Sequence, residues 1–200
     1  MKTKSEARRQ HIVEVATEVF AETGFERASM AEISARVGGS KATLYNYFPS
    51  KEELFLEVMV SNNHAHFAAV QESLEISDAP IRQVLQDFGE ALVELIYSED
   101  VLAVRRLVIA EAVRSDLGYE CYCRSRKQGE QQIATQLYKA VQQQQLNDHP
   151  PAIMTAHLLS LLEAEFLDRM VRRHAPPLQH EEIRAAVSRA LDVFLAFYGA

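Results

Sequence analysis

Small and hydrogen-bonding side chains share one side of a short helix predicted after Ser40. Wound at about 100° per residue, this helix turns Leu44 and Phe48 inward. The outward positions are Ala42, Thr43, Tyr45 and Asn46, with Tyr47 on the flank. A short helix with such groups outside suits the major groove of DNA, where base edges present donors, acceptors and methyl groups.

A lysine stands at the start of the next predicted helix. Ser50 and Glu53 have the S-x-x-E spacing of a capping box, which places Lys51 at the first helical position. Because backbone N–H groups are exposed at a helix start, a lysine beside them makes a phosphate anchor. These two adjacent segments therefore predict a surface that binds nucleic acid.

The preceding residues explain how the outward face would be positioned. Ser29 and Glu32 form another S-x-x-E box, which predicts a helix beginning at Met30. The Gly38-Gly39 pair supplies positive-φ turn positions that end this helix. Ser40 then serves as the N-cap of the second short helix. This is the layout of a helix-turn-helix.

An earlier amphipathic helix supports the same unit. Its buried stripe follows the i, i+3, i+4 spacing and consists of Ile12, Val15, Ala16, Val19 and Phe20. Gly24 is expected to end the helix in the left-handed conformation, which would bring Phe20 against Phe25 in a Schellman ending.

These segments resemble the TetR (tetracycline-repressor-like) family of bacterial transcriptional regulators. The resemblance is carried by residues 12–24, Ser29-Met30, Ile33 and the run from Ser40 to Phe55. One departure is Gly39, since similar proteins usually carry a small apolar residue such as valine in this turn. We expect lower stability there and retained function.

The resemblance implies a helix-turn-helix DNA-binding domain over residues 1–50 and a helical effector-binding and dimerisation domain over residues 51–200. The implied protein is a homodimeric repressor that binds a palindromic double-stranded operator and is released by a small effector. The many aromatic and aliphatic residues favour a hydrophobic effector, and no cofactor is expected. In this mechanism the outward face of residues 42–46 reads bases. The residues expected to hold phosphates are Ser29, Lys41, Tyr47 and Lys51. The alternatives are an activator and a helical sensor that does not bind DNA.

Composition agrees with a helical, DNA-binding chain. The 200 residues include 48% hydrophobic residues and only seven glycines. The net charge is −7, but residues 1–51 carry +2 and residues 52–200 carry −9. Lys2, Lys4, Arg8 and Arg9 are expected to form a basic arm that reaches phosphates or to remain a solvated terminus. Because no transmembrane-length apolar run or signal peptide occurs, we expect a cytoplasmic protein without membrane contact.

The remaining sequence predicts helices throughout. Expected helices run from 51 to about 74, from 80 to 97, from 98 onward and from 119 to 146, with two more after the proline pairs at 150–151 and 176–177. No strand-like alternation occurs. The fold class is therefore all-α, with about nine helices.

The last two helices carry more apolar surface than a terminal hairpin easily hides. If the same hairpin of a second copy covered it, a four-helix interface would result. The residues assigned to that dimer interface are Leu158, Leu162, Val187, Leu191, Phe194 and Tyr198. The alternative is that these faces complete the core of a single chain.

The effector site is expected among the middle helices. Candidate aromatic residues are Phe67, Phe88, Tyr122 and Phe166. The charged residues that interrupt apolar stripes are Arg105, Glu111 and Glu165, and each is either an effector contact or a structural ion-pair partner.

Metal and enzyme chemistry is not expected. Cys121 and Cys123 on a helix point about 200° apart, which disfavours a disulfide or a shared metal. His64 and His66 have the same unsuitable offset, so a metal enzyme using them is the weaker hypothesis. No phosphate loop or nucleophile elbow occurs.

Overall fold

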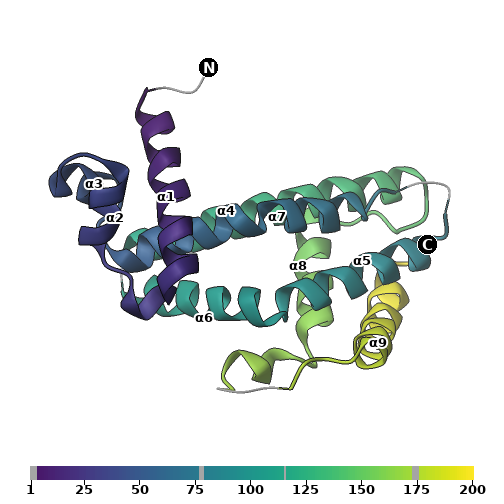
Figure 1. The fold of residues 1–200 in the computed structure, drawn as a ribbon. Helices are drawn as coiled ribbons and strands as arrows, with labels where there is room; N and C mark the ends of the chain where they lie inside the picture. The colour runs from purple at the N-terminus through teal and green to yellow at the C-terminus, as the bar shows by residue number, and fades with distance from the viewer. Residues whose placement is uncertain (1–3, 77–78, 115, 173–175) are drawn as a thin grey trace.

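One long helix and two short ones form the N-terminal unit. In the computed structural model, residues 4–76, 79–114, 116–172 and 176–200 are described, with only the backbone described for some helical residues. Helix α1 is Lys4–Arg27, α2 is Met30–Val37 and α3 is Lys41–Tyr47. They lie together at one end of the chain, where α1 crosses the start of α4 (Figure 1).

The predicted caps set the ends of these helices. Ser29 Oγ accepts a hydrogen bond from the backbone N–H of Glu32 at 3.2 Å, and Ser40 Oγ accepts one from that of Thr43 at 3.1 Å. Gly38 and Gly39 have φ values of 69° and 141°, so the expected positive-φ turn is confirmed. The second hydrogen bond of the predicted Ser29/Glu32 capping box is not formed, because the Glu32 carboxylate binds Arg36 at 3.1 Å instead of capping Ser29.

The end of α1 is only partly as predicted. Gly24 has the expected positive φ of 76°, and the Phe20 and Phe25 rings meet with centroids 6.1 Å apart. However, the chain makes another helical turn, because the backbone N–H of Ala28 donates to the Gly24 carbonyl at 3.1 Å. Helix α1 therefore extends to Arg27 across a kink.

Six more α-helices follow and lie close to the predicted boundaries. They are α4 Lys51–Glu72, α5 Ile81–Ile96, α6 Glu99–Arg114, α7 Asp116–Gln142, α8 Pro151–Glu163 and α9 His180–Tyr198. The turn of 3-10 helix η1, Leu167–Met170, was not expected. The described residues contain one isolated β-bridge and no strand, so the all-α prediction with nine α-helices is confirmed. No helix in the described ranges combines the length and apolar character needed to cross a membrane.

The glutamine run ends α7 in a Schellman motif. Gln144 takes a left-handed φ of 57°. The N–H of Gln145 donates to the Ala140 carbonyl and that of Gln144 to the Val141 carbonyl, both at 2.9 Å. The helix thus ends in this motif without the usual glycine at the left-handed position.

The described residues form two hydrophobic cores, and α4 contributes to both ends of the molecule. The N-terminal core joins the apolar stripes of α1 and α2 to Leu44 and Phe48, and includes Leu54 and Val58 of α4. The C-terminal core packs α5 against α9 and α8 between α7 and α9. The physical N-terminal unit therefore reaches beyond residue 50.

The residues assigned to a dimer interface lie in the core of a single chain. All six are at most 4% exposed: Leu158, Leu162, Val187, Leu191, Phe194 and Tyr198. They pack with α5 and α7 and are not available to a second copy in this conformation. Their assignment must therefore be corrected. An apolar helical stripe has the same spacing whether it faces its own chain or a partner.

Gly89 of α5 lies against side chains of α8 and α9. A Cβ built at Gly89 would lie 2.7 Å from Val187 Cγ1 and 2.9 Å from Leu162 Cδ2. No real Cβ is found that close to another carbon, so a side chain here forces α5 away from α8 and α9.

We expect Gly89→Ala to lower the free energy of unfolding by about 1–2 kcal/mol, because overpacking outweighs alanine's better helix propensity. Urea denaturation measures this loss. Val187→Ala introduced together with Gly89→Ala should cost less than the sum of the two single changes, since it removes the clashing methyl groups. Additive losses of unfolding free energy would show that the contact between residues 89 and 187 does not cause the destabilisation.

Candidate nucleic-acid interface

The outward face of α3 is oriented as the sequence predicts. Leu44 and Phe48 are each 2% exposed within the N-terminal core. Tyr45 is 46% exposed, Ala42 and Asn46 are exposed, and Thr43 is half-buried. The Thr43 hydroxyl lies 2.9 Å from Ser40 Oγ, so it also belongs to the helix cap. Small and hydrogen-bonding groups thus face outward from a firmly anchored two-turn helix.

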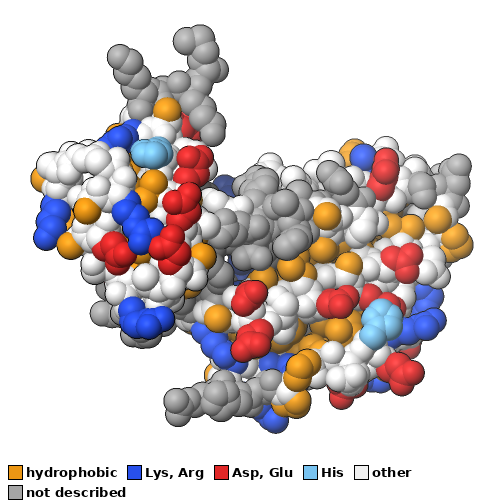
Figure 2. All heavy atoms as spheres, in the orientation of Figure 1, with side chains coloured by type: hydrophobic (Ala, Val, Ile, Leu, Met, Phe, Trp, Pro, Cys, Tyr) orange, Lys and Arg blue, Asp and Glu red, His pale blue; other side chains and the backbone are white. Residues whose placement is uncertain are grey.

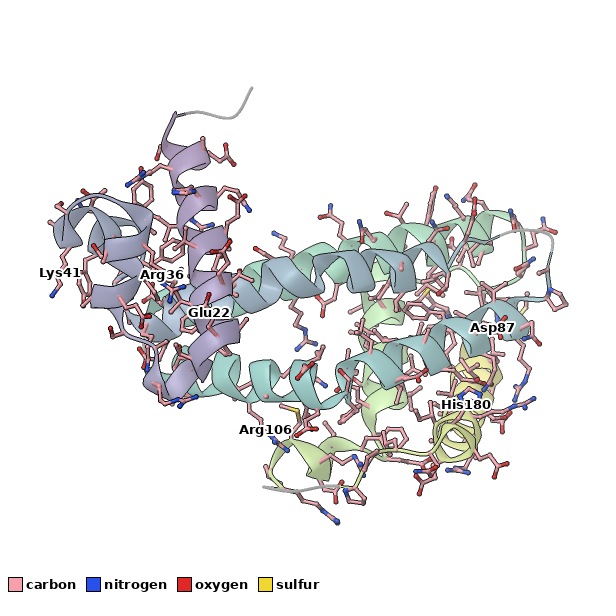
Figure 3. The ribbon with its side chains drawn as sticks, viewed as in Figure 1. Glu22, Arg36, Lys41, Asp87, Arg106 and His180 are labelled. Atoms are coloured by element: carbon pink, nitrogen blue, oxygen red, sulfur yellow. The ribbon has the colours of Figure 1, made fainter. Side chains whose placement is uncertain are left out.

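Three of the four residues expected to hold phosphates are at least partly exposed. Ser29 is exposed and caps α2, while Tyr47 is half-buried against the N-terminal core. Lys41 is exposed at the start of α3 and extends away from the rest of the chain (Figure 3). Their contacts to DNA stay predictions.

Lys51 has an intramolecular role as well. Its Nζ donates to the Phe25 carbonyl at 2.8 Å and lies 4.3 Å from the centroid of the Phe25 ring. The ammonium group therefore ties the start of α4 to the end of α1. Its proposed phosphate contact stays a prediction, and any variant of Lys51 also changes this tie.

Two arginines expected in a basic arm pack against the body. The Arg8 guanidinium donates to the Gly38 carbonyl. Arg9 pairs with Glu57 at 2.5 Å and lies over the Phe48 ring at 4.9 Å. The expected arm is thus corrected for these two residues. Lys2 and the side chain of Lys4 lie outside the described residues.

An ion-pair cluster joins α1 to α2. Arg36 lies 2.7 Å from Glu22 and 3.1 Å from Glu32, and Figure 3 shows the Glu22 and Arg36 side chains meeting. The hydrogen bond and charge of Arg36 lower the pKa of Glu22. Figure 2 shows acidic and basic side chains side by side over these helices. The two carboxylates therefore neutralise the positive charge of Arg36. Lys41 at the start of α3, in contrast, is expected to use its charge to hold a phosphate.

The candidate effector residue Arg105 belongs to a partly buried polar cluster. Its Nη2 lies 2.5 Å from Glu163, and its guanidinium lies over the Tyr97 ring at 5.4 Å. The Tyr97 hydroxyl donates to the same carboxylate at 3.1 Å. Burial, and then the charge of Glu163, raise the pKa of Tyr97 to about 12, so the phenol remains a donor. The structural ion-pair interpretation therefore holds for Arg105 in this conformation.

The other candidates divide into three groups. Glu165 forms a two-bond pair with Arg189, at 2.9 and 2.6 Å, whose hydrogen bonds lower the pKa of Glu165. Phe88 and Phe166 are buried in the C-terminal core, where Phe166 packs 5.5 Å from Tyr97. The side chains of Phe67, Glu111 and Tyr122 lie outside the described residues, although their helices α4, α6 and α7 are described.

Arg106 is a structural residue that sequence reasoning missed. Its guanidinium donates to the carbonyls of Met170, Arg169 and Arg172 at 2.9, 2.6 and 2.5 Å. It thereby caps the end of η1 from α6 (Figure 3). No sequence signal reveals this contact, because all three acceptors belong to the backbone.

Most of the residues considered for metal or redox chemistry have side chains that are not described. The side chains of His64, His66 and Cys121 lie outside the described residues, and Cys123 is a half-buried free thiol. Within the described part of the chain, no three histidine, cysteine or acidic residues come together as a metal site.

Sequence comparison matches both ends of the chain to one family. Residues 12–58 match the profile described as bacterial regulatory proteins of the TetR family. Residues 83–200 match the C-terminal domain of AefR-like transcriptional repressors. Together these matches cover the helix-turn-helix and most of the remaining helices.

Individual relatives agree with these matches. The nucleoid occlusion factor SlmA of Pasteurella multocida is 28% identical over 91% of this chain and 93% of its own length. The repressor DhaR of a Mycobacterium species is 28% identical over 54% of this chain and 57% of its own length.

Solved structures extend the likeness to the whole fold. A TetR-family regulator from Mesorhizobium loti superimposes over 100% of both chains with a TM-score of 0.78 at 24% identity. The flavonoid-responsive regulator FrrA matches 96% of this chain and 97% of its own, with a TM-score of 0.70 and 26% identity. With its capped recognition helix and both family matches, the chain belongs to the TetR family of transcriptional regulators and is not an enzyme.

Proposed function

We propose that the chain is a homodimeric repressor that binds a palindromic operator and is released by a small hydrophobic effector. The observation that carries the proposal is the exposed face of α3, which the buried Leu44 and Phe48 hold in place. This face lies in the part of the chain that matches the TetR family. Repression is supported by the match to AefR-like repressors over residues 83–200.

In the proposed complex the two kinds of DNA contact are divided among different residues. Base edges are contacted by four residues, through hydrogen bonds and small apolar groups: Ala42, Thr43, Tyr45 and Asn46. Ser29, Lys41, Tyr47 and Lys51 hold phosphates and thereby set the register of α3 along the groove.

Asn46→Ala and Lys41→Ala test this division, because both side chains are exposed. The test uses a duplex that the protein selects from a random pool and a second duplex of the same composition in scrambled order. We expect Asn46→Ala to weaken binding to the selected duplex about 5- to 150-fold and to leave binding to the scrambled duplex unchanged. Lys41→Ala should weaken both and reduce the slope of log K against log salt by about 1.8, because each dimer loses two lysines. Mobility-shift titrations over a salt series measure both effects.

The control for Lys41 is Lys139→Ala, which removes an exposed lysine from α7. It should bind both duplexes as the original protein does. If the original protein shows no salt-dependent DNA binding at all, the chain is a helical sensor instead of a DNA-binding regulator.

The proposed dimer uses the outer faces of α8 and α9, not their buried stripes. Ile153, Val193 and Phe197 are 50%, 58% and 63% exposed on these helices. A second copy would cover them by two-fold symmetry. The two α3 helices would then lie about 34–36 Å apart, or at a multiple of one helical turn, and contact the two half-sites.

We expect Val193→Glu to shift the dimer to monomer, because it places a charge in a desolvated interface. Light scattering coupled to gel filtration measures the mass, and affinity for the selected palindromic duplex should fall with it. The matched control is Val113→Glu on α6, at a position 86% exposed. A dimer that persists in Val193→Glu would place the interface elsewhere.

A hydrophobic, aromatic effector is supported by the 26% identity to FrrA, a protein described as flavonoid-responsive. In the proposed mechanism the effector binds among the C-terminal helices and moves α4. Because α4 contributes Leu54 and Val58 to the N-terminal core, this movement changes the distance between the two α3 helices of the dimer. A ligand shifts the equilibrium only by its differential affinity for the two states.

A panel of flavonoids should therefore include a compound that lowers operator affinity about 5- to 150-fold, as expected for couplings of 1–3 kcal/mol. Linkage requires that operator DNA weaken binding of that compound by the same factor, which calorimetry measures. The same compounds are added to an unrelated repressor on its own operator, to exclude direct effects on DNA. No change with any flavonoid would reject this effector class.

A further inference from the structure

Two consecutive arginines of α1 contact the segments that precede and follow the recognition helix α3. Arg8 donates to the carbonyl of Gly38, in the turn that precedes α3. Arg9 lies over the ring of Phe48, the residue directly after α3, at 4.9 Å from its centroid. Helix α1 thus contacts, through two adjacent residues, the chain on either side of α3: the C-cap of α2 before it and the C-cap residue after it.

Arg9 also connects this arrangement to α4. Its Nη1 lies 2.5 Å from Oε1 of Glu57, and the two side chains are 39% and 25% exposed. Helix α4 is the helix that leaves the N-terminal unit for the C-terminal core. The position of α3 is therefore tied to α4 through the Arg9 guanidinium and through the packing of Leu54 and Val58.

The glycine pair of the turn makes room for Arg8. A Cβ built at Gly39 would lie 2.9 Å from Nη2 of Arg8, whereas one built at Gly38 meets nothing within 4 Å. Both residues have positive φ, so the backbone conformation alone does not distinguish them. The departure of Gly39 from the family's usual apolar residue thus coincides with the approach of the Arg8 guanidinium.

A short helix depends on such contacts for its orientation. Helix α3 has seven residues and buries one of them, Leu44. Helices of this length are not stable alone and take their direction from tertiary contacts. Because base contacts tolerate displacements of only about 0.5 Å, end contacts to α3 affect base reading more than they affect phosphate binding. The planar, forked guanidinium holds a carbonyl or an aromatic face in one defined geometry.

We propose that Arg8 and Arg9 are positioning residues for sequence recognition: they orient α3 against the base edges, and Arg9 links that orientation to α4. Their charge is not used to hold phosphates. This inference rests on the proposed DNA binding, and its test separates the two.

The experiment measures the ratio of affinities for two duplexes. The original protein selects a duplex from a random pool of about 30 base pairs, long enough for two half-sites. The comparison duplex has the same composition in scrambled order. Arg8→Ala, Arg8→Lys and Arg9→Ala are titrated on both duplexes over a salt series.

We expect the affinity ratio to fall about tenfold in each variant, the scale of one lost charge-assisted hydrogen bond, with the salt slope unchanged. Arg8→Lys is decisive, because it keeps the charge and loses the fork. Arg27→Ala is the matched control, since it removes an arginine from the same helix whose Nε donates at 3.0 Å to Thr23 of α1. It should keep the full ratio.

A double-mutant cycle tests the role of Gly39. Gly39→Ala displaces Arg8, so combining it with Arg8→Ala should lower the ratio less than the product of the two single effects. Gly38→Ala provides the comparison, because it adds a Cβ at positive φ in open space. Its effect should multiply with that of Arg8→Ala. Thermal unfolding of each variant identifies losses that come from an unfolded N-terminal unit.

Three results would overturn the inference. A ratio retained within about twofold in Arg8→Ala and Arg8→Lys would show that Arg8 does not position α3. Equal losses on both duplexes, with a salt slope reduced by about 1.8 for the two arginines lost per dimer, would make the arginines phosphate ligands. Independent effects of Gly39→Ala and Arg8→Ala would show that Gly39 does not act by leaving room for the Arg8 side chain. Absence of salt-dependent binding by the original protein would instead reject the proposed function itself.

Discussion

The packing of α4 into the N-terminal core is the constraint on which the rest of the structure depends. Leu54 and Val58 are buried with the apolar stripe of α1, and the Phe55 ring lies 5.1 Å from Phe20 and 4.7 Å from Phe25. Lys51 adds a hydrogen bond to the carbonyl of Phe25. The three helices of the DNA-binding unit therefore cannot rotate freely on a linker. Any movement of α4 must be followed by the surface that carries α3.

Arginines make many of the contacts that join separate helices. Arg8 and Arg9 connect α1 to the ends of α3, and Arg106 connects α6 to the end of η1. Arg105 joins α6 to Glu163 at the end of α8. Their long side chains reach backbone carbonyls, rings and carboxylates, and the planar fork makes each contact directional. Consecutive arginines thus act on different elements, both in the N-terminal unit and in the C-terminal body.

Local signals predicted the features that depend on a few neighbouring residues. The caps at Ser29, Ser40 and Ser50, and the glycine turn at 38–39, follow from side-chain and backbone requirements within four residues. The inward direction of Leu44 and Phe48 follows from helical periodicity. The dimer residues were wrong because the stripe containing Leu158 and Val187 has the same spacing in a core as in an interface. Only the packing of α5, α7, α8 and α9 shows which surface the stripe faces.

The sequence by itself determined the helical class, most helix boundaries and the outward face of α3, because capping and periodicity are local properties. It also identified the family through the run from Ser40 to Phe55. The tertiary structure alone decided that Arg8 and Arg9 turn toward the protein and that Arg105 pairs with Glu163. It also decided that Ile153, Val193 and Phe197 remain exposed. The physical reason is that long side chains choose partners distant in sequence, and those partners become neighbours only when the helices pack.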